Sequence, residues 1–267
     1  AATIAAATSL VVTDTNLTIA DAAAVNALTK PATYDVVDSF ADFTNAAGTA
    51  AASVAVGTML TGARTVTLSD ATNTVAQYNV IAGLTSGTIV NNAAVTGTTL
   101  TISDTIAKLA TSGAAAAVTA AAGGSVTASD VGTTNATVAQ AELLVDYGIS
   151  IDGIDIVDTS ANIAAMSADL VTAIVAANGN ASANDTTVSS SDNAAMTLSV
   201  AVANAVFDVT GAAAETDGSN YANYSLSDTA ANLANANAGL VNLAQAVTAT
   251  GVAATYLQAG TLAGLTT

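Results

Sequence analysis

The chain has 267 residues and a formal net charge of −17, because 20 acidic side chains face only three basic ones. That balance excludes the usual nucleic-acid binders, which neutralise phosphates with a patch of Lys and Arg, so we expect no nucleic-acid partner. The sequence contains neither cysteine nor histidine, which removes thiol nucleophiles, disulfides, the usual zinc sites and imidazole bases, so we expect no enzyme activity.

One pattern recurs along the chain: apolar residues that alternate with Ser or Thr, a marker residue, and then an Ala-rich stretch. Apolar residues stand four and two positions before nearly every marker, which is the alternation of a half-buried strand. In chain order the markers are Asp14, Asp38, Asp70, Asp104, Asp130, Asp158, Asp192, Asp228 and, as a departure, Gly251. Such repeats are typical of solenoids. We therefore predict an α/β fold, a strand–helix solenoid of about nine repeats with one parallel sheet, as a single domain over residues 1–267.

The clearest copy of the pattern begins at Tyr224, where Tyr224 and Leu226 alternate with serine. Asp228 then ends the strand and is placed to cap a helix, because its carboxylate can accept backbone N–H groups of the first turn. By the same reasoning, Asp104, Asp158 and Asp228 should each accept a hydrogen bond from an N–H two or three residues ahead, within their own helix.

Two kinds of repeat alternate. In the first kind the marker is followed at once by Ser or Thr, as in residues 38–43, 104–109, 158–163 and 228–233. The second kind carries the run Thr-Val-Ala-Gln, at residues 74–77 and 137–140. Asn162 suggests a buried asparagine ladder, but Lys108 and Asp42 fill the equivalent place in other repeats. Only an exposed site accepts that set, so we predict no ladder.

One segment is a candidate metal site. Asp152, Asp155 and Asp158 stand at three-residue spacing beside Gly153, and carboxylate oxygens at such spacing could bind calcium. The segment lacks a bidentate Glu and does not match the EF-hand loop, so a solvated strand edge explains the same residues. Two polar insertions, residues 178–187 and 208–223, should be loops. No other cofactor is expected.

The two ends of the chain are predicted to form an assembly interface. Neither residues 1–8 nor residues 252–267 carry a charged side chain, and the spacing of markers would continue almost unbroken if copies abutted. We therefore predict a head-to-tail homopolymer, held by Leu257, Leu262 and Leu265 of one copy against Ile4 and Leu10 of the next. Such an interface joins two different surfaces, and it grows into a fibre if the rotation does not close a ring.

The runs Tyr-Ser-Leu-Ser-Asp-Thr-Ala-Ala-Asn-Leu at 224–233 and Thr-Val-Ala-Gln at 137–140 resemble Ala/Thr/Asp-rich repeat modules of very large bacterial secreted surface proteins. The resemblance covers essentially the whole chain. It implies export to the cell surface or the extracellular space, by a type I route, and a role in adhesins, surface layers or fibres.

No apolar run approaches the roughly 18 residues of a membrane span, so no membrane-spanning helix is expected.

The leading functional hypothesis is accordingly a structural subunit of an extracellular filament or surface layer that assembles head to tail. The alternative is a stalk or ligand-binding segment of a large bacterial adhesin. An ice-binding surface is a third hypothesis, because ranks of Ser and Thr on a flat sheet serve that activity. Asp35 and Val37 interrupt those ranks, which argues against it.

Overall fold

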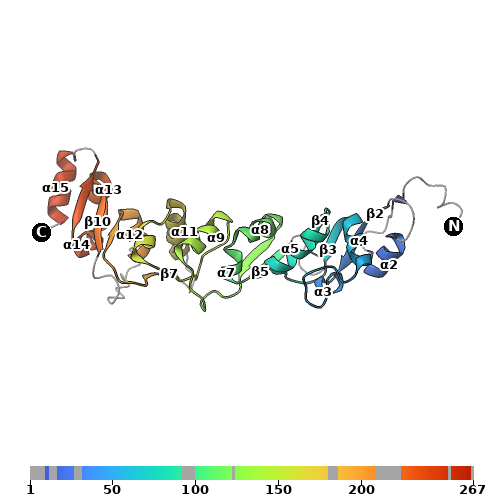
Figure 1. Ribbon diagram of the computed structural model, residues 1–267. Coiled ribbons are helices and arrows are strands. Elements are labelled where there is room, and N and C mark those ends of the chain that lie inside the picture. Colours follow the sequence, from blue (N-terminus) through green and yellow to red (C-terminus); the bar gives the residue numbers. More distant parts are fainter. Residues whose placement is uncertain are drawn as a thin grey trace. The chain divides into compact units, whose positions relative to one another are not determined.

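Figure 1 shows the computed structural model of the chain, which describes residues 10–11, 17–26, 32–91, 100–121, 124–179, 186–207, 224–251 and 254–265. The chain divides into two compact units, Ala1–Ser129 and Asp130–Thr267. Each unit mixes short parallel strands with short helices, so the predicted α/β class is confirmed. Over the described ranges, no helix is both long and apolar enough to cross a membrane.

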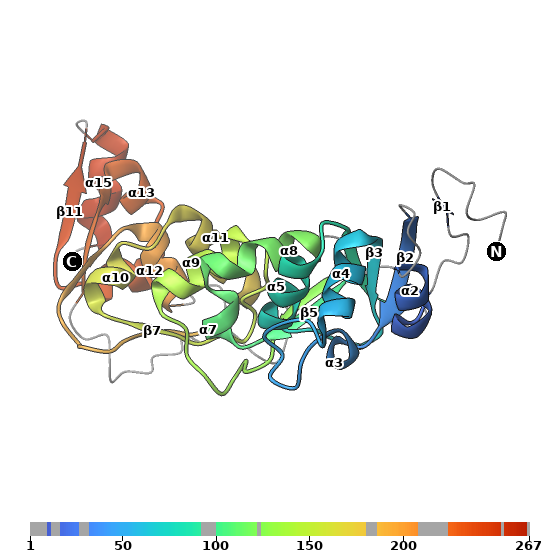
Figure 2. The same ribbon diagram turned by 45° about the vertical axis from the view of Figure 1, so that its right-hand side comes forward.

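The described part of the first unit contains two parallel sheets, one with the strand order β1-β2-β3-β4 and one that pairs β5 with β6. Figure 2 shows β2 and β3 of the first sheet side by side. Its elements are β1 (Leu10–Val11), α2 (Ile19–Asn26), β2 (Ala32–Asp38), α3 (Phe40–Phe43), α4 (Val54–Gly62), β3 (Ala63–Leu68), α5 (Val75–Leu84), β4 (Thr88–Asn91), β5 (Thr101–Asp104), α7 (Ile106–Leu109), the 3-10 helix η1 (Ser112–Ala114), α8 (Ala115–Ala120) and β6 (Ser125–Ala128).

The second unit also contains two parallel sheets, one that pairs β7 with β8 and one with the order β11-β10-β9. Its elements are α9 (Val138–Asp146), β7 (Ile156–Asp158), α10 (Ser160–Ala164), α11 (Ala168–Asn178), β8 (Val188–Ser190), β9 (Met196–Leu198), α12 (Val200–Phe207), β10 (Tyr224–Thr229), α13 (Ala230–Ala234), α14 (Ala238–Leu243), β11 (Val247–Thr250) and α15 (Tyr256–Leu265).

The strands are parallel, as predicted, but they form several small sheets instead of one. The break lies at certain markers, where the backbone before and after the turn pairs with different neighbours. β8 precedes Asp192 and pairs with β7, whereas β9 follows Asp192 and pairs with β10. The turn offsets the chain, so the hydrogen-bonded ladder on one side of it does not continue on the other.

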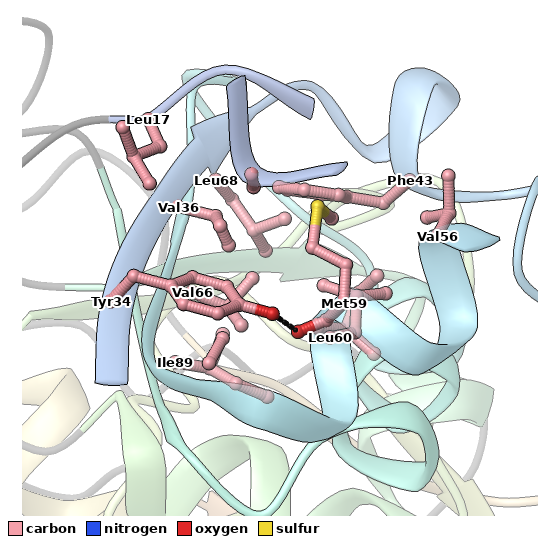
Figure 3. Close-up of a cluster of buried hydrophobic side chains, with 13 residues drawn as sticks. Leu17, Tyr34, Val36, Phe43, Val56, Met59, Leu60, Val66, Leu68 and Ile89 are labelled. Carbon is pink, nitrogen blue, oxygen red and sulfur yellow. Dashed lines mark hydrogen bonds between the residues drawn. The ribbon is translucent and has the colours of Figure 1, made fainter. Parts of the chain in front are cut away.

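The core of the first unit explains why the strand pattern has a period of two. Tyr34 and Val36 of β2, like Val66 and Leu68 of β3, point into one buried cluster that includes Met59 of α4 (Figure 3). All five are at most 1% exposed. Successive strand residues point to opposite faces, so the intervening residues point away from this cluster.

Two tyrosines at the same repeat position make the same contact. The Tyr34 hydroxyl donates a hydrogen bond of 2.8 Å to the backbone carbonyl of Met59 in α4 (Figure 3). The Tyr224 hydroxyl donates one of 2.6 Å to the carbonyl of Leu240 in α14. Both tyrosines are buried, and a buried hydroxyl needs a partner of this kind. The bond satisfies a carbonyl near the end of each helix, where such groups lack partners within the helix.

Candidate functional site

The marker aspartates do not cap their own helices in the way predicted. The N-cap of α10 is Thr159 and that of α13 is Thr229, and their hydroxyls accept the N–H groups of Asn162 and Asn232. The N-cap of α7 is Thr105. The marker lies one residue earlier in the chain, so one of its oxygens accepts the backbone N–H of the next residue. These distances are 2.9 Å to Thr105, 2.7 Å to Thr159 and 2.7 Å to Thr229. The predicted bond two or three residues ahead is therefore wrong.

The second carboxylate oxygen of these markers reaches back to the helix of the preceding repeat. It accepts the N–H of the first residue of that helix, a contact that we call an aspartate clasp. The clasps of Asp104 to Val75, Asp158 to Val138 and Asp228 to Val200 measure 3.1, 3.0 and 2.9 Å. Asp70 makes a clasp of 2.6 Å to Phe40, Asp192 one of 3.0 Å to Ser160, and Asp38 bonds the N–H of Ile19.

Clasps are favourable for two reasons. A helix leaves its first N–H groups without partners inside the helix, and an ionised acceptor forms a stronger hydrogen bond than a neutral one. The negative charge also lies at the positive end of the helix dipole. Each clasp therefore links two consecutive repeats. It also gives a partner to a helix N–H group that would otherwise have to bond to water.

The repeats are of two types, and the types alternate. In type A repeats the marker directly precedes the Ser or Thr N-cap, and these markers are Asp38, Asp104, Asp158 and Asp228. In type B repeats several residues separate the marker from the Ser or Thr that precedes the helix. The type B helices are α2, α5, α9, α12 and α15. The residues that precede them are, in the same order, Thr18, Thr74, Thr137, Ser199 and Thr255. Type A markers clasp type B helices, and Asp70 and Asp192 clasp type A helices.

The residue just before the N-cap of a type B repeat also pairs with the following type A strand. We call it the bridge residue. The four parallel pairs are Leu17 with Val36, Asn73 with Ile102, Ala136 with Ile156, and Leu198 with Leu226. In every pair, the strand partner stands two residues before its marker. Each of these type B repeats is thus fixed on the next repeat by a bridge and a clasp in one register.

The clasps of the second unit change the acidity of their carboxylates. Burial opposes ionisation of Asp158, but hydrogen bonds from Asn162, Thr159 and Val138 outweigh burial and lower the pKa of this carboxyl. Burial is again the largest influence at Asp228, where bonds from Val200, Asn232 and Thr229 outweigh it and lower the pKa. Asn162 and Asn232 are exposed, as predicted for this position of the repeat. Their side-chain amides donate hydrogen bonds of 2.7 and 2.8 Å to Asp158 and Asp228.

Asp192 lies in a cluster of polar groups that joins two repeats. The Ser160 hydroxyl lies 2.7 Å from the Ser190 hydroxyl, 2.7 Å from Asp192 Oδ1 and 3.0 Å from the carbonyl of Ala194. Asp192 also accepts hydrogen bonds from the Ser190 hydroxyl and from the N–H groups of Ser160 and Ala194. The bonds to this carboxylate, led by the one from the Ser160 hydroxyl, hold its pKa well below its ordinary value. Ser160 belongs to α10, and Ser190 and Asp192 belong to the next repeat, so these bonds tie two repeats together. The sequence feature that indicated this cluster is Ser190, because the other repeats have an apolar residue two positions before the marker.

The structure does not gather the predicted calcium ligands. Asp158 binds Val138 in its clasp, and Asp155 accepts the hydroxyl of Thr187. Asp152 lies in a turn where its backbone N–H donates to Ser150 Oγ at 3.3 Å. Among the residues that the structure describes, no three acidic side chains form a group that could hold a metal ion. The spacing along a turn and a short strand directs Asp155 and Asp158 to different partners.

The predicted assembly residues are only partly described. Ile4 lies outside the described residues, and Leu10 belongs to β1, an outer strand of its sheet. Leu257 of α15 is 78% exposed, Leu262 is half-buried, and α15 ends at Leu265. β11 is the corresponding outer strand of its sheet, and most of its residues are exposed.

A surface cavity of about 550 Å³ lies in the first unit. The start of α2, including Ile19, forms one side, Asp38 and Asp42 lie on another, and the start of α4, including Ser53, closes it. Met59 is among the apolar residues that line it. Burial, together with the contact to Asp42, raises the pKa of Asp38, the opposite of the direction at Asp158.

Comparison with protein-family models, curated proteins and solved structures finds no match for this chain. The features that recur along the described chain are the bridges and clasps between consecutive repeats.

Proposed function

We propose that this protein is a structural subunit of an extracellular filament or surface layer, built as a strand–helix solenoid whose repeats are locked by aspartate clasps. The observation that carries the proposal is the recurrence of the clasp at six markers, Asp38, Asp70, Asp104, Asp158, Asp192 and Asp228. In a solenoid each repeat contacts only its neighbours, so stability depends on such nearest-neighbour contacts.

The chemical character of the chain supports a structural role. Its serine cluster lacks an imidazole base, and the six clasp aspartates accept backbone N–H groups. The resemblance to secreted bacterial surface proteins supports an extracellular location. A strongly acidic surface keeps such a protein soluble before assembly.

The proposed assembly is head to tail and involves the C-terminal repeat. β11 is the outer strand of its sheet, and an outer strand presents unpaired backbone groups that can pair with another chain. Leu257 adds an exposed apolar side chain on α15, the helix that follows β11 in the chain. An interface between two different ends is heterologous and continues to grow.

Sedimentation velocity across a concentration series, with negative-stain electron microscopy, tests this function. The wild-type chain should form filaments or sheets, and Leu257→Asp should remain monomeric because a charge would be buried at the join. Val175→Asp is the matched control, since Val175 is also exposed, at 39%, but lies on α11. Dispersed wild-type particles at high concentration would contradict the proposal and favour a stalk segment.

A further inference from the structure

The cavity of about 550 Å³ in the first unit is lined in part by a chain segment that is longer here than in related repeats. In this type A repeat, residues 44–53 join α3 to α4. The corresponding joins in the other type A repeats are residues 110–111, 165–167 and 235–237. Ala52 and Ser53, the last two residues of the longer join, line the cavity. The insertion therefore supplies part of the cavity wall.

The inserted segment is folded back on itself. The Asn45 N–H bonds the Ala50 carbonyl at 2.9 Å, and the Ala52 N–H bonds the Phe43 carbonyl at 2.9 Å. Between these bonds Gly48 turns the chain with a φ of +64°, a conformation that glycine adopts readily. This part of the wall is thus in place before any ligand arrives, which reduces the entropy that binding costs.

The cavity has an apolar part and an acidic part. Ile19 of α2 lines it, and so do Val56 and Met59 of α4, which Figure 3 labels. The acidic part consists of Asp38 and Asp42, whose side chains contact each other. A volume of this size lies within the range of about 300 to 1,000 Å³ that is usual for small-molecule sites.

The two carboxylates have no basic partner in the cavity. None of the described residues that line it is Lys or Arg. Arg64 pairs with Asp35 instead, Lys108 belongs to α7, and Lys30 lies outside the described residues. Two carboxylates in contact repel each other when both are ionised, and a cation placed beside them favours the ionised forms. The acidic part of the cavity is therefore complementary to a positive charge.

We propose that this cavity binds a small amphiphilic amine, with its ammonium group on Asp38 and Asp42 and its apolar chain against Ile19, Val56 and Met59. An ammonium group donates up to three hydrogen bonds, and a carboxylate has about four acceptor positions. Such bonds are charge-assisted and strong, and removal of the alkyl chain from water adds to the affinity.

The acceptor positions needed for this contact remain after the bonds within the protein are counted. Asp38 accepts the N–H groups of Ser39 and Ile19, and Asp42 accepts the hydroxyl of Ser39. Each carboxylate therefore keeps acceptor positions for an incoming donor. The site is independent of the proposed assembly, because none of its residues belongs to the proposed head-to-tail interface.

Isothermal titration calorimetry with n-hexylammonium chloride tests the proposal. The wild-type chain should bind this cation saturably, and n-hexanol, which has the same alkyl chain without the charge, should bind many-fold more weakly. Ala55 is exposed, lines the cavity and lies in the first turn of α4. Ala55→Leu should fill the cavity and abolish binding without lowering the melting temperature, because leucine is also a good helix former.

A pair of charge variants separates the site from general attraction to an acidic protein. Asp42→Asn removes one negative charge from the cavity and should weaken binding several-fold, in keeping with a charge pair near the surface. Asp169→Asn is the matched control, because Asp169 is also exposed and lies in the first turn of its helix, α11. It removes the same charge outside the cavity and should leave binding unchanged.

The other outcomes would overturn the proposal. Equal weakening by Asp42→Asn and Asp169→Asn would show that the overall negative charge attracts the cation. Unchanged binding in Ala55→Leu would show that the cation binds outside the cavity. Equal affinity for n-hexylammonium and n-hexanol would show that the carboxylates do not recognise the ammonium group.

Discussion

Asp228 Oδ2 accepts a hydrogen bond of 2.9 Å from the backbone N–H of Val200, which is 28 residues earlier in the chain and begins the helix of the preceding repeat. The aspartates that form clasps therefore act across a repeat boundary. One carboxylate fixes the start of its own helix through Thr229 and the start of its neighbour through Val200. The type A markers Asp38, Asp104 and Asp158 make the same two kinds of bond, which explains why an aspartate stands between the strand and the N-cap in these repeats.

We expect Asp228→Asn to lower the free energy of unfolding by about 1 to 2 kcal/mol, because it weakens charge-assisted bonds at two helix starts. Hydrogen exchange should show faster exchange of the Val200 amide in particular. Asp146→Asn is the control, since Asp146 is exposed and ends α9, where loss of a negative charge is neutral or slightly stabilising. Unchanged protection of Val200 in Asp228→Asn would contradict the clasp.

The clasps make stability depend on pH. The pKa of Asp192 is well below its ordinary value in the folded chain, first because of the bond from the Ser160 hydroxyl. In the unfolded chain the carboxyl takes up a proton near its usual pKa of about 3.9, so the stabilisation is complete above that pH. It is lost progressively as the pH falls towards the folded pKa. Urea unfolding as a function of pH should show this acid loss in the wild type and a shallower slope in Asp192→Asn. An equal slope in both would contradict the assignment.

The hydroxyl of Tyr224 provides a separate test of the core. Tyr224→Phe keeps the ring but leaves the carbonyl of Leu240, which now receives the hydroxyl at 2.6 Å, without that donor. We expect a loss of about 1 to 3 kcal/mol, the range for an unsatisfied buried polar group. Tyr34→Phe removes the equivalent bond to Met59 and should have a similar effect. Chemical denaturation of both variants measures it, and wild-type stability in both would show that water satisfies these carbonyls.

Much of the fold was accessible from the sequence because the signal was periodic. Apolar alternation before Asp104 and Asp158 predicted parallel strands with buried residues such as Ile102 and Ile156. The clasps could not be predicted from the sequence. An aspartate is equally suited to cap its own helix and to bond the start of a helix 20 to 32 residues earlier, so the residue type does not tell the two apart. The division into several sheets was missed for a similar reason. The sequence of the turn at Asp192 does not indicate whether the strands on its two sides pair with the same neighbour or with different ones.

The last prediction concerns two glycines only four residues apart in the chain, Gly83 and Gly87. A Cβ atom on Gly87, just before β4, would lie 2.5 Å from the carbonyl oxygen of Ala63 and 2.6 Å from that of Arg64. Those atoms belong to the neighbouring strand β3, so Gly87→Ala must push two strands apart. We expect a loss of about 1 to 3 kcal/mol or more. A Cβ on Gly83 would meet nothing within 4 Å.

Gly83 lies within α5, where alanine is favoured over glycine by about 0.5 to 1 kcal/mol. Gly83→Ala should therefore raise the midpoint of urea unfolding and Gly87→Ala should lower it, although both add the same methyl group. The opposite signs separate close backbone approach from simple helix propensity. A rise for Gly87→Ala would show that strand β4 does not pack against β3 at the distance described, and a fall for Gly83→Ala would contradict the gain expected from helix propensity.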